Sequence, residues 1–130
     1  MTKPTEHSLT WEVTDEMTAK RIGSAGSKIL STPNMVALME ACALELAKNY
    51  LEEGETTVGA EIHCRHLAPT PVGMKVWVEA EVTAVSENGK MVDFSLKAWD
   101  EKGPIGEGTH TRAIINNERF LAKCNAKLEK

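Results

Sequence analysis

The chain carries one long segment, between residues 31 and 54, that has almost no polar face. Three helical turns of it are apolar around most of their circumference, and alanines at 37, 41, 43 and 47 permit close packing. Ser31 or Thr32 is the predicted N-cap, with Pro33 as the first helical residue, and Gly54 ends the element. A helix of this kind has to be largely buried, so the remaining chain must wrap around it.

The segments around this helix alternate apolar and polar residues, which is the pattern of strands with one buried face. One predicted strand precedes the helix and four follow it, at residues 9–14, 58–66, 75–86, 91–99 and 105–116. Asn88-Gly89 marks a hairpin turn, Gly23–Ser27 a flexible turn or loop, and Glu118–Lys130 a short terminal helix. We therefore predict a single two-layer α+β domain over residues 1–130, with its last four strands forming an antiparallel meander.

Charge and cysteine content exclude several classes of protein. The 130 residues carry a net charge of −4 with a pI of about 5.6, which argues against a nucleic-acid-binding module and against adhesion to an anionic membrane. No secretory signal is visible, and no apolar run approaches the ~20 residues of a membrane span. The cysteines at 42, 64 and 124 fit neither a disulfide framework nor a zinc ribbon. We expect a soluble cytoplasmic protein with reduced thiols.

Glu40 is the first candidate for chemistry. It is the only charged residue between Lys28 and Glu45, and it lies between Met39 and Ala41 on the most apolar helix. Burying a carboxylate is costly unless it is paired or protonated, and a carboxyl group in an apolar pocket suits an acid–base catalyst. A narrow polar stripe or a buried hydrogen bond would explain Glu40 without a catalytic role.

His66 is the second candidate, because it ends the inward face of its predicted strand in register with Ile62 and Cys64. Such a histidine can act as a base or bind a substrate, or it can be a core histidine with its own partner. His63 is three residues away, so its side chain leaves the opposite face, and the same alternation places Gly59 with His63. Cys64 and His66 share a face, but two ligands without a third do not predict a metal site.

Thr32 and the last strand supply further candidates. Thr32 precedes a proline, which is typical of a plain N-cap, but its hydroxyl and the free N–H groups of that helix end can also face a substrate oxygen. Glu40 lies about 12 Å further along the axis, so direct contact with Thr32 is not expected. His110 and Arg112 share a face of the last strand, as a solvated or interfacial pair or as a contact to a phosphate or thioester.

Four motifs, taken in order, resemble those of a known family. They are Ser31-Thr-Pro-Asn-Met-Val-Ala-Leu-Met-Glu40, Thr57-Val-Gly59, His66-Leu-Ala-Pro-Thr-Pro-Val-Gly73 and Ile105-Gly-Glu-Gly-Thr-His-Thr-Arg112. From about residue 9 to residue 122 the chain resembles the fluoroacetyl-CoA thioesterase-like family. The resemblance implies the hotdog fold, in which an antiparallel sheet wraps around one long central helix.

The resemblance also implies hydrolysis of a small acyl-CoA thioester at a dimer interface, with no metal and with CoA only as part of the substrate. The family's catalytic threonine, glutamate and histidine match Thr32, Glu40 and His66, and the glycine near the thioester matches Gly59. The fluoroacetyl-specific enzyme has an aromatic lid ahead of the helix, whereas Arg21–Ser27 contains no aromatic residue. This segment predicts a less selective or differently selective thioesterase.

Two other functions stay open: a hydratase or dehydratase of acyl thioesters, and a non-catalytic acyl-CoA-binding or dimerisation module. The acid on the buried helix behind Thr-Pro favours hydrolysis over hydration, and a pure scaffold would gain by having leucine in place of Glu40. A sheet covered by one helix leaves exposed edges, and such edges invite pairing. We therefore expect a homodimer or a dimer of dimers, with the long helices adjacent and each site drawing on both chains.

Overall fold

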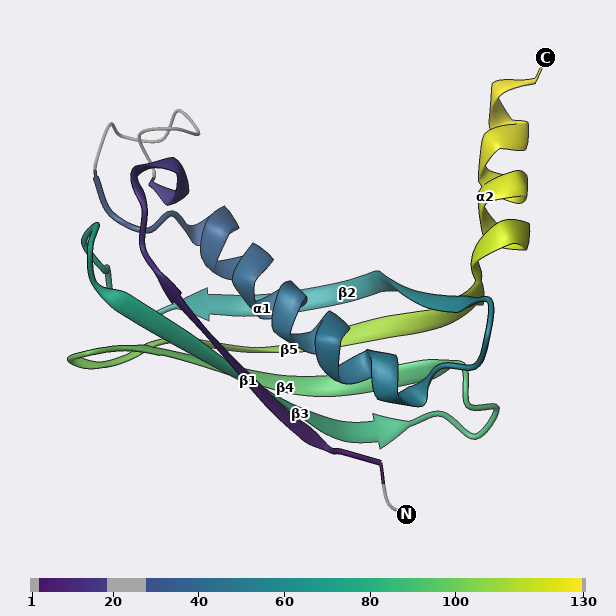
Figure 1. Cartoon of the computed structure of the whole chain (residues 1–130), viewed down its shortest axis with the longest axis horizontal. Helices are drawn as coiled ribbons and strands as arrows, with labels where there is room; N and C mark the ends of the chain where they lie inside the picture. The colour runs from purple at the N-terminus through teal and green to yellow at the C-terminus, as the bar shows by residue number, and fades with distance from the viewer. Residues whose placement is uncertain (1–2, 19–27, 130) are drawn as a thin grey trace.

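The computed structural model describes residues 3–18 and 28–129 (Figure 1). Its elements, in chain order, are β1 (Glu6–Glu12), η1 (Asp15–Met17), α1 (Thr32–Ala47), η2 (Lys48–Tyr50), β2 (Glu55–His66), β3 (Lys75–Val85), β4 (Met91–Asp100), β5 (Gly103–Asn116), α2 (Asn117–Asn125) and η3 (Ala126–Leu128), where η denotes a short 3₁₀ helix. The predicted turn at Gly23–Ser27 and the lid segment Arg21–Ser27 lie outside the described residues.

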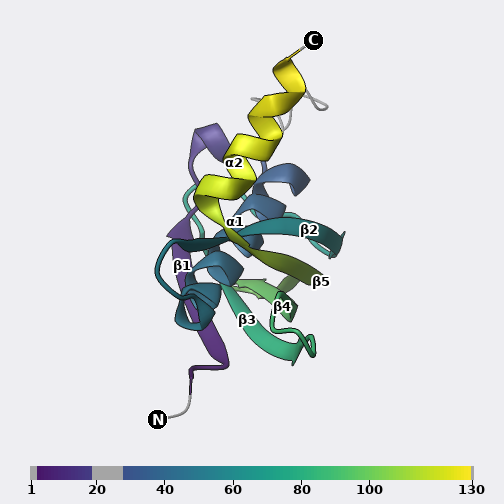
Figure 2. The ribbon, with the colours of Figure 1, turned by 90° about the vertical axis from the view of Figure 1, so that its right-hand side faces the viewer.

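The five strands form one antiparallel sheet whose inner face packs on α1 (Figures 1 and 2). This confirms the two-layer α+β architecture. The strand order is β1-β3-β4-β5-β2, so only β3, β4 and β5 form a meander and the expected four-stranded meander is wrong. β1 pairs with one side of β3, and β4 with the other, which leaves β2 to pair with β5 at the opposite end of the sheet.

The core lies between α1 and the central strands. On α1 the buried residues are Met35, Leu38, Met39, Cys42, Ala43, Leu46 and Ala47. They pack against the inner faces of β3 and β4, where Val76, Val78, Ala80, Val92, Phe94, Leu96 and Ala98 are all buried. The alternation predicted for β4 is confirmed, whereas a register shift after Val82 in β3 leaves Ala84 exposed. Apolar burial of this kind supplies the main driving force for folding.

Ser31 is the residue that caps α1. Its backbone is extended, and its Oγ accepts hydrogen bonds from the Asn34 backbone N–H at 3.1 Å and from the Asn34 Nδ2 at 2.6 Å. Thr32 is therefore the first helical residue and Pro33 the second, so the helix begins one residue earlier than the sequence predicted. Because Ser31 satisfies the helix end, the Thr32 hydroxyl is left to take a different partner.

Replacing the cap should weaken the fold more than replacing its neighbour. Ser31→Ala should lower the free energy of unfolding by about 1 kcal/mol, because the Asn34 N–H loses its acceptor. Thr32→Ala leaves the cap intact and should cost less. Urea denaturation of the two variants beside the unsubstituted protein measures the difference, and an equal or larger loss in Thr32→Ala would show that Thr32 shares the capping role.

Candidate functional site

A register shift in β2 decides which of its side chains face α1. Gly59 pairs with Arg112 but Glu61 pairs with Thr111, so Ala60 is an extra residue on β2. Gly59 consequently faces α1, where a Cβ placed on it would lie 3.1 Å from the Glu40 Oε2. The prediction that Gly59 shares the outer face with His63 is wrong, because strict alternation along the sequence makes no allowance for a bulge.

Thr32 and His66 form the first group of candidate residues. The first residue of α1 and the last residue of β2 meet here, with the Thr32 Oγ1 2.7 Å from the His66 Nδ1. The His66 Nε2 is buried and has no hydrogen-bond partner among the residues that the structure describes. Burial lowers the pKa of His66, and the nearby backbone of Ala68 opposes this shift. The lowered pKa leaves the ring neutral at neutral pH. A neutral ring of this kind can accept or pass on a proton.

Glu40 belongs to a second group, midway along α1. Its Oε2 lies 3.8 Å from the Arg112 Nη1 and 4.0 Å from the His110 Nε2. The Glu40 side chain is 40% exposed in the single chain, so the expected apolar pocket is not what surrounds it. The reason is that β5 presents the polar side chains of His110 and Arg112 to Glu40.

His110 and Arg112 are buried beneath Glu40, so a solvated pair is excluded. The Arg112 side chain, 8% exposed, donates from Nε to the Thr57 Oγ1 at 2.8 Å and from Nη2 to the Thr57 carbonyl at 3.1 Å. Its Nη1 lies 3.1 Å from the His110 Nε2, and the His110 Nδ1 lies 2.8 Å from the Glu61 carbonyl. Burial is the largest cause of a lowered pKa at His110. Arg112 lowers it further, and the Glu61 carbonyl and Glu40 oppose the shift.

Sequence reasoning missed the parts that Thr57 and the Glu61 carbonyl play in this group. Both lie within two residues of Gly59, on either side of the extra residue of β2. Strict alternation would place Thr57 on the outer face with Gly59, whereas the bulge turns both toward α1, and Thr57 is buried. A glycine and an alanine interrupting an otherwise regular strand is the one sequence signal that points to such a bulge.

The two groups lie apart within one chain. Six residues along β5 separate Gly106, which pairs with His66, from Arg112, which pairs with Gly59, a span of about 20 Å at 3.3 Å per residue. Thr32 and Glu40 are about 12 Å apart along α1. The structure therefore brings Thr32 to His66, and Glu40 to Gly59 and Arg112, but it does not bring all of these residues to one point.

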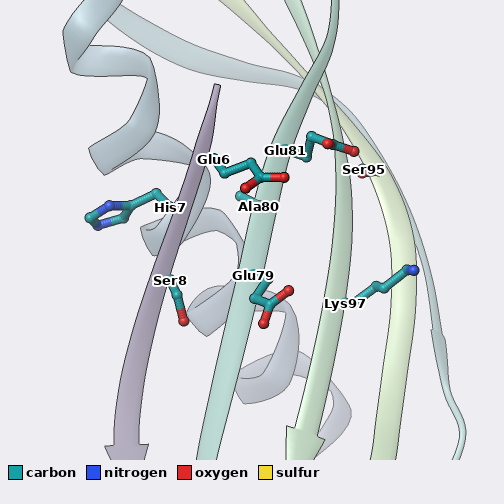
Figure 3. A pocket seen from close by; sticks show the side chains of 8 residues that line it. All are labelled: Glu6, His7, Ser8, Glu79, Ala80, Glu81, Ser95 and Lys97. Atoms are coloured by element: carbon teal, nitrogen blue, oxygen red, sulfur yellow. The ribbon is translucent and has the colours of Figure 1, made fainter. Parts of the chain in front are cut away.

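The face of the sheet turned away from α1 carries a depression of about 570 Å³. Figure 3 shows the side chains on β1, β3 and β4 that line it, among them Glu79, Glu81 and Lys97. None of the predicted site residues belongs to it. Within residues 3–18 and 28–129, no three His, Cys, Asp or Glu side chains lie close enough to hold a metal ion. No helix in that part of the chain is long and apolar enough to cross a membrane.

The lowered pKa values of His66 and His110 should make the fold sensitive to acid. Below about pH 6.5 an unfolded histidine takes up a proton that the folded ring does not, so acid favours the unfolded chain. We expect the free energy of unfolding to fall between about pH 7 and pH 5.5, and to fall less in His66→Gln and in His110→Gln. Urea denaturation at several pH values in this range measures the effect. If the free energy of unfolding falls as steeply with acid in both variants as in the unsubstituted protein, the two histidines are not the cause.

The chain matches the sequence model of the family described as fluoroacetyl-CoA-specific thioesterase, FlK, over residues 13–118. It is 39% identical over 100 residues to the fluoroacetyl-CoA thioesterase of Streptantibioticus cattleyicolor. The aligned residues make up 77% of this chain and 70% of that protein. A crystal structure of a FlK variant superposes with a TM-score of 0.89 at 32% identity, covering 98% of this chain and 97% of that one. Other FlK crystals contain acetyl-CoA, or fluoroacetate and CoA.

A hot-dog-like protein from Thermanaerovibrio acidaminovorans superposes with a TM-score of 0.88 at 25% identity, covering 97% of this chain and 92% of that one. These similarities confirm the hotdog fold, with α1, continued by η2, as the central helix.

Proposed function

The chain belongs to the fluoroacetyl-CoA-specific thioesterase family and is an acyl-CoA thioester hydrolase, and from this premise we propose that it cleaves small acyl-CoA thioesters with Thr32, Glu40 and His66. The observation that carries the proposal is the placement of Glu40. Its partly exposed carboxylate lies against the backbone of Gly59, the glycine that the family resemblance assigns to the thioester. Glycine allows a substrate to approach the backbone more closely than any other residue would.

Each residue has a part in the hydrolysis. Glu40 either takes a proton from a water molecule that attacks the carbonyl carbon, or attacks that carbon itself to form a transient anhydride that water then opens. The carbon–sulfur bond breaks, and the proton that the water gives up passes through the His66 Nε2 to the CoA thiolate, which leaves Glu40 ionised and the His66 ring neutral again. The Thr32 hydroxyl fixes the ring through Nδ1, or turns to the developing oxyanion.

Arg112 has its predicted substrate-binding role only through Nη1. Its Nε and Nη2 each donate to Thr57, whereas Nη1 lies 3.7 Å from where a Cβ of Gly59 would be and 3.8 Å from the Glu40 Oε2. A carbonyl or water bound over Gly59 therefore meets both the carboxylate and a positive charge. This is the charge pattern that an attack on a thioester carbonyl requires.

We propose that a homodimer joins the two groups into one site. β2 is an edge strand of 12 residues, and an antiparallel pair formed by two copies of it is isologous. Pairing centred on His63, with the extra residue Ala60 left out of the ladder, would place His66 opposite the partner's Gly59. Because directly opposite residues in an antiparallel pair point to the same face, His66 and Thr32 of one chain would then face the partner's Glu40.

Helix α2 supports the same assembly. It leaves the end of β5 and extends past β2, away from the rest of the chain (Figures 1 and 2). No residue of α2 is buried, and Phe120, Leu121 and Leu128, the last in η3, are 41%, 49% and 85% exposed. A second chain paired along β2 would lie beside α2, where it can cover these exposed apolar side chains.

The catalytic assignment predicts a graded loss of activity. Glu40→Gln keeps the shape of the side chain and removes the base or nucleophile, so kcat/KM should fall by about 10²- to 10⁴-fold. His66→Ala should fall comparably. Thr32→Ser keeps the hydroxyl and should be mild, and Thr32→Ala should be worse. Release of free thiol from a panel of acyl-CoA thioesters, from acetyl to aromatic, measures the effect for each folded variant and identifies the best acyl group.

Two controls make this series specific. His63 is exposed on the opposite face of β2 and Cys64 lies beside His66, so His63→Ala and Cys64→Ala should stay within a few fold of the unsubstituted protein. A large loss of kcat/KM in His63→Ala, together with an unchanged kcat/KM in His66→Ala, would overturn the assignment of the site. Conversion of an unsaturated acyl-CoA without release of thiol would favour hydration instead.

The shared site predicts complementation between two inactive variants. When Glu40→Gln and His66→Ala chains are co-expressed with different tags and purified through both, each heterodimer contains one site with neither substitution. We expect about half of the activity of the unsubstituted dimer, because one of two sites is intact. Each variant homodimer is the matched control. Activity no higher than theirs, or a monomer by light scattering at micromolar concentration, would contradict the shared site.

A further inference from the structure

The proton on the His110 ring has a determined position. A carbonyl oxygen only accepts hydrogen bonds, so the Nδ1 that lies 2.8 Å from the Glu61 carbonyl must carry a proton. A guanidinium only donates, so the Nε2 that lies 3.1 Å from the Arg112 Nη1 must be an acceptor. The neutral Nδ1–H form is the one state of the ring that satisfies both contacts.

The ring is also held rigidly. His110 is 2% exposed and packs against Phe94, with the ring centroids 6.1 Å apart. The Glu61 carbonyl that holds the Nδ1 comes from the register shift of β2, beside Gly59. The bulge that turns Gly59 toward the site therefore also supplies the acceptor that sets the His110 tautomer.

His110 completes the hold on Arg112. Thr57 binds the Nε and Nη2 of the guanidinium, which leaves Nη1 as the nitrogen nearest to Glu40. The Nε2 of His110 accepts from this nitrogen and fixes where it points. The Glu40 Oε2 is 3.8 Å from Nη1 and 4.0 Å from the His110 Nε2, both beyond hydrogen-bond distance, so the carboxylate faces a fixed charge without being tied to it.

We propose that His110 is a positioning residue for Glu40, which acts by holding the Arg112 Nη1 beside the carboxylate through an accepting Nε2. This inference rests on the proposed catalytic role of Glu40. Without the Nε2 acceptor, the whole planar guanidinium can shift on its Thr57 contacts until Nη1 donates a direct hydrogen bond to the carboxylate. That bond would occupy the lone pair that the reaction needs, while substrate binding elsewhere is unaffected.

Two substitutions separate the two contacts of the ring. His110→Asn retains a donor for the Glu61 carbonyl and loses the acceptor for Arg112, whereas His110→Gln retains an acceptor near the position of Nε2. We expect kcat to fall by about 10- to 100-fold in His110→Asn with a smaller rise in KM, and both to stay within about threefold in His110→Gln. Equal kcat in the two variants, or losses that follow their stabilities in urea, would overturn the positioning role.

A double variant shows whether His110 acts through Glu40. Glu40→Gln combined with His110→Asn should be no slower than Glu40→Gln alone, because the residue being positioned is already gone. Losses that multiply would mean that His110 acts by a separate route. The Glu40→Gln single variant also tests the proposed function independently of His110. If that single variant keeps its full kcat, the proposed function fails, whatever the His110 variants do.

A measurement on the unsubstituted protein covers the case in which His110→Asn does not fold. The ¹⁵N chemical shifts of the His110 ring, assigned by their loss in His110→Gln, report which nitrogen carries the proton. We expect a protonated Nδ1 and an unprotonated, hydrogen-bonded Nε2 at neutral pH. A proton on Nε2 would exclude acceptance from Arg112 and overturn the proposal.

Discussion

The structure depends on the burial of a helix that has almost no polar face. Because α1 cannot remain in water, the inner faces of β3 and β4 are apolar along their length, and these strands occupy the middle of the sheet. The outer strands then take the places that remain, with β1 at one edge and β2 at the other. Three of the buried polar residues, Thr57, His110 and Arg112, lie on β2 and β5, where α1 presents Glu40 to them.

One extra residue in β2 converts this polar end of the sheet into a candidate site. The bulge at Ala60 brings Thr57 and Gly59 to the face that His66 already occupies, and it places the Glu61 carbonyl beside His110. A buried arginine is tolerated only when its donors are paired, and Thr57 and His110 together pair all three nitrogens. The same contacts that make the burial of Arg112 tolerable also determine where its charge points.

The separation of the two groups follows from the geometry of the elements. A helix rises about 1.5 Å per residue and a strand about 3.3 Å per residue. Two contact points between α1 and β2 that are several residues apart in sequence are therefore also far apart in space. Thr32 with His66, and Glu40 with Gly59, are two such meeting points. In a family whose members act on acyl-CoA, an unpaired β2 edge and an exposed apolar α2 give a physical reason for the second chain in the proposed site.

The sequence by itself determined the buried helix, the five strands with small shifts in their ends, the terminal helix and the identity of Thr32, Glu40 and His66 as candidates, because these depend on local periodicity and on motifs. It did not determine the strand order, the inward side of Gly59 or the partners of Arg112, and it left the cap of α1 open between Ser31 and Thr32. The strand order depends on which edge of β3 is already paired, and the side of Gly59 and the partners of Arg112 depend on a bulge that alternation does not encode. Only the tertiary structure decided that Glu40 faces a fixed cation and not an apolar pocket, because contacts between α1 and β5 join residues about 70 positions apart in the chain.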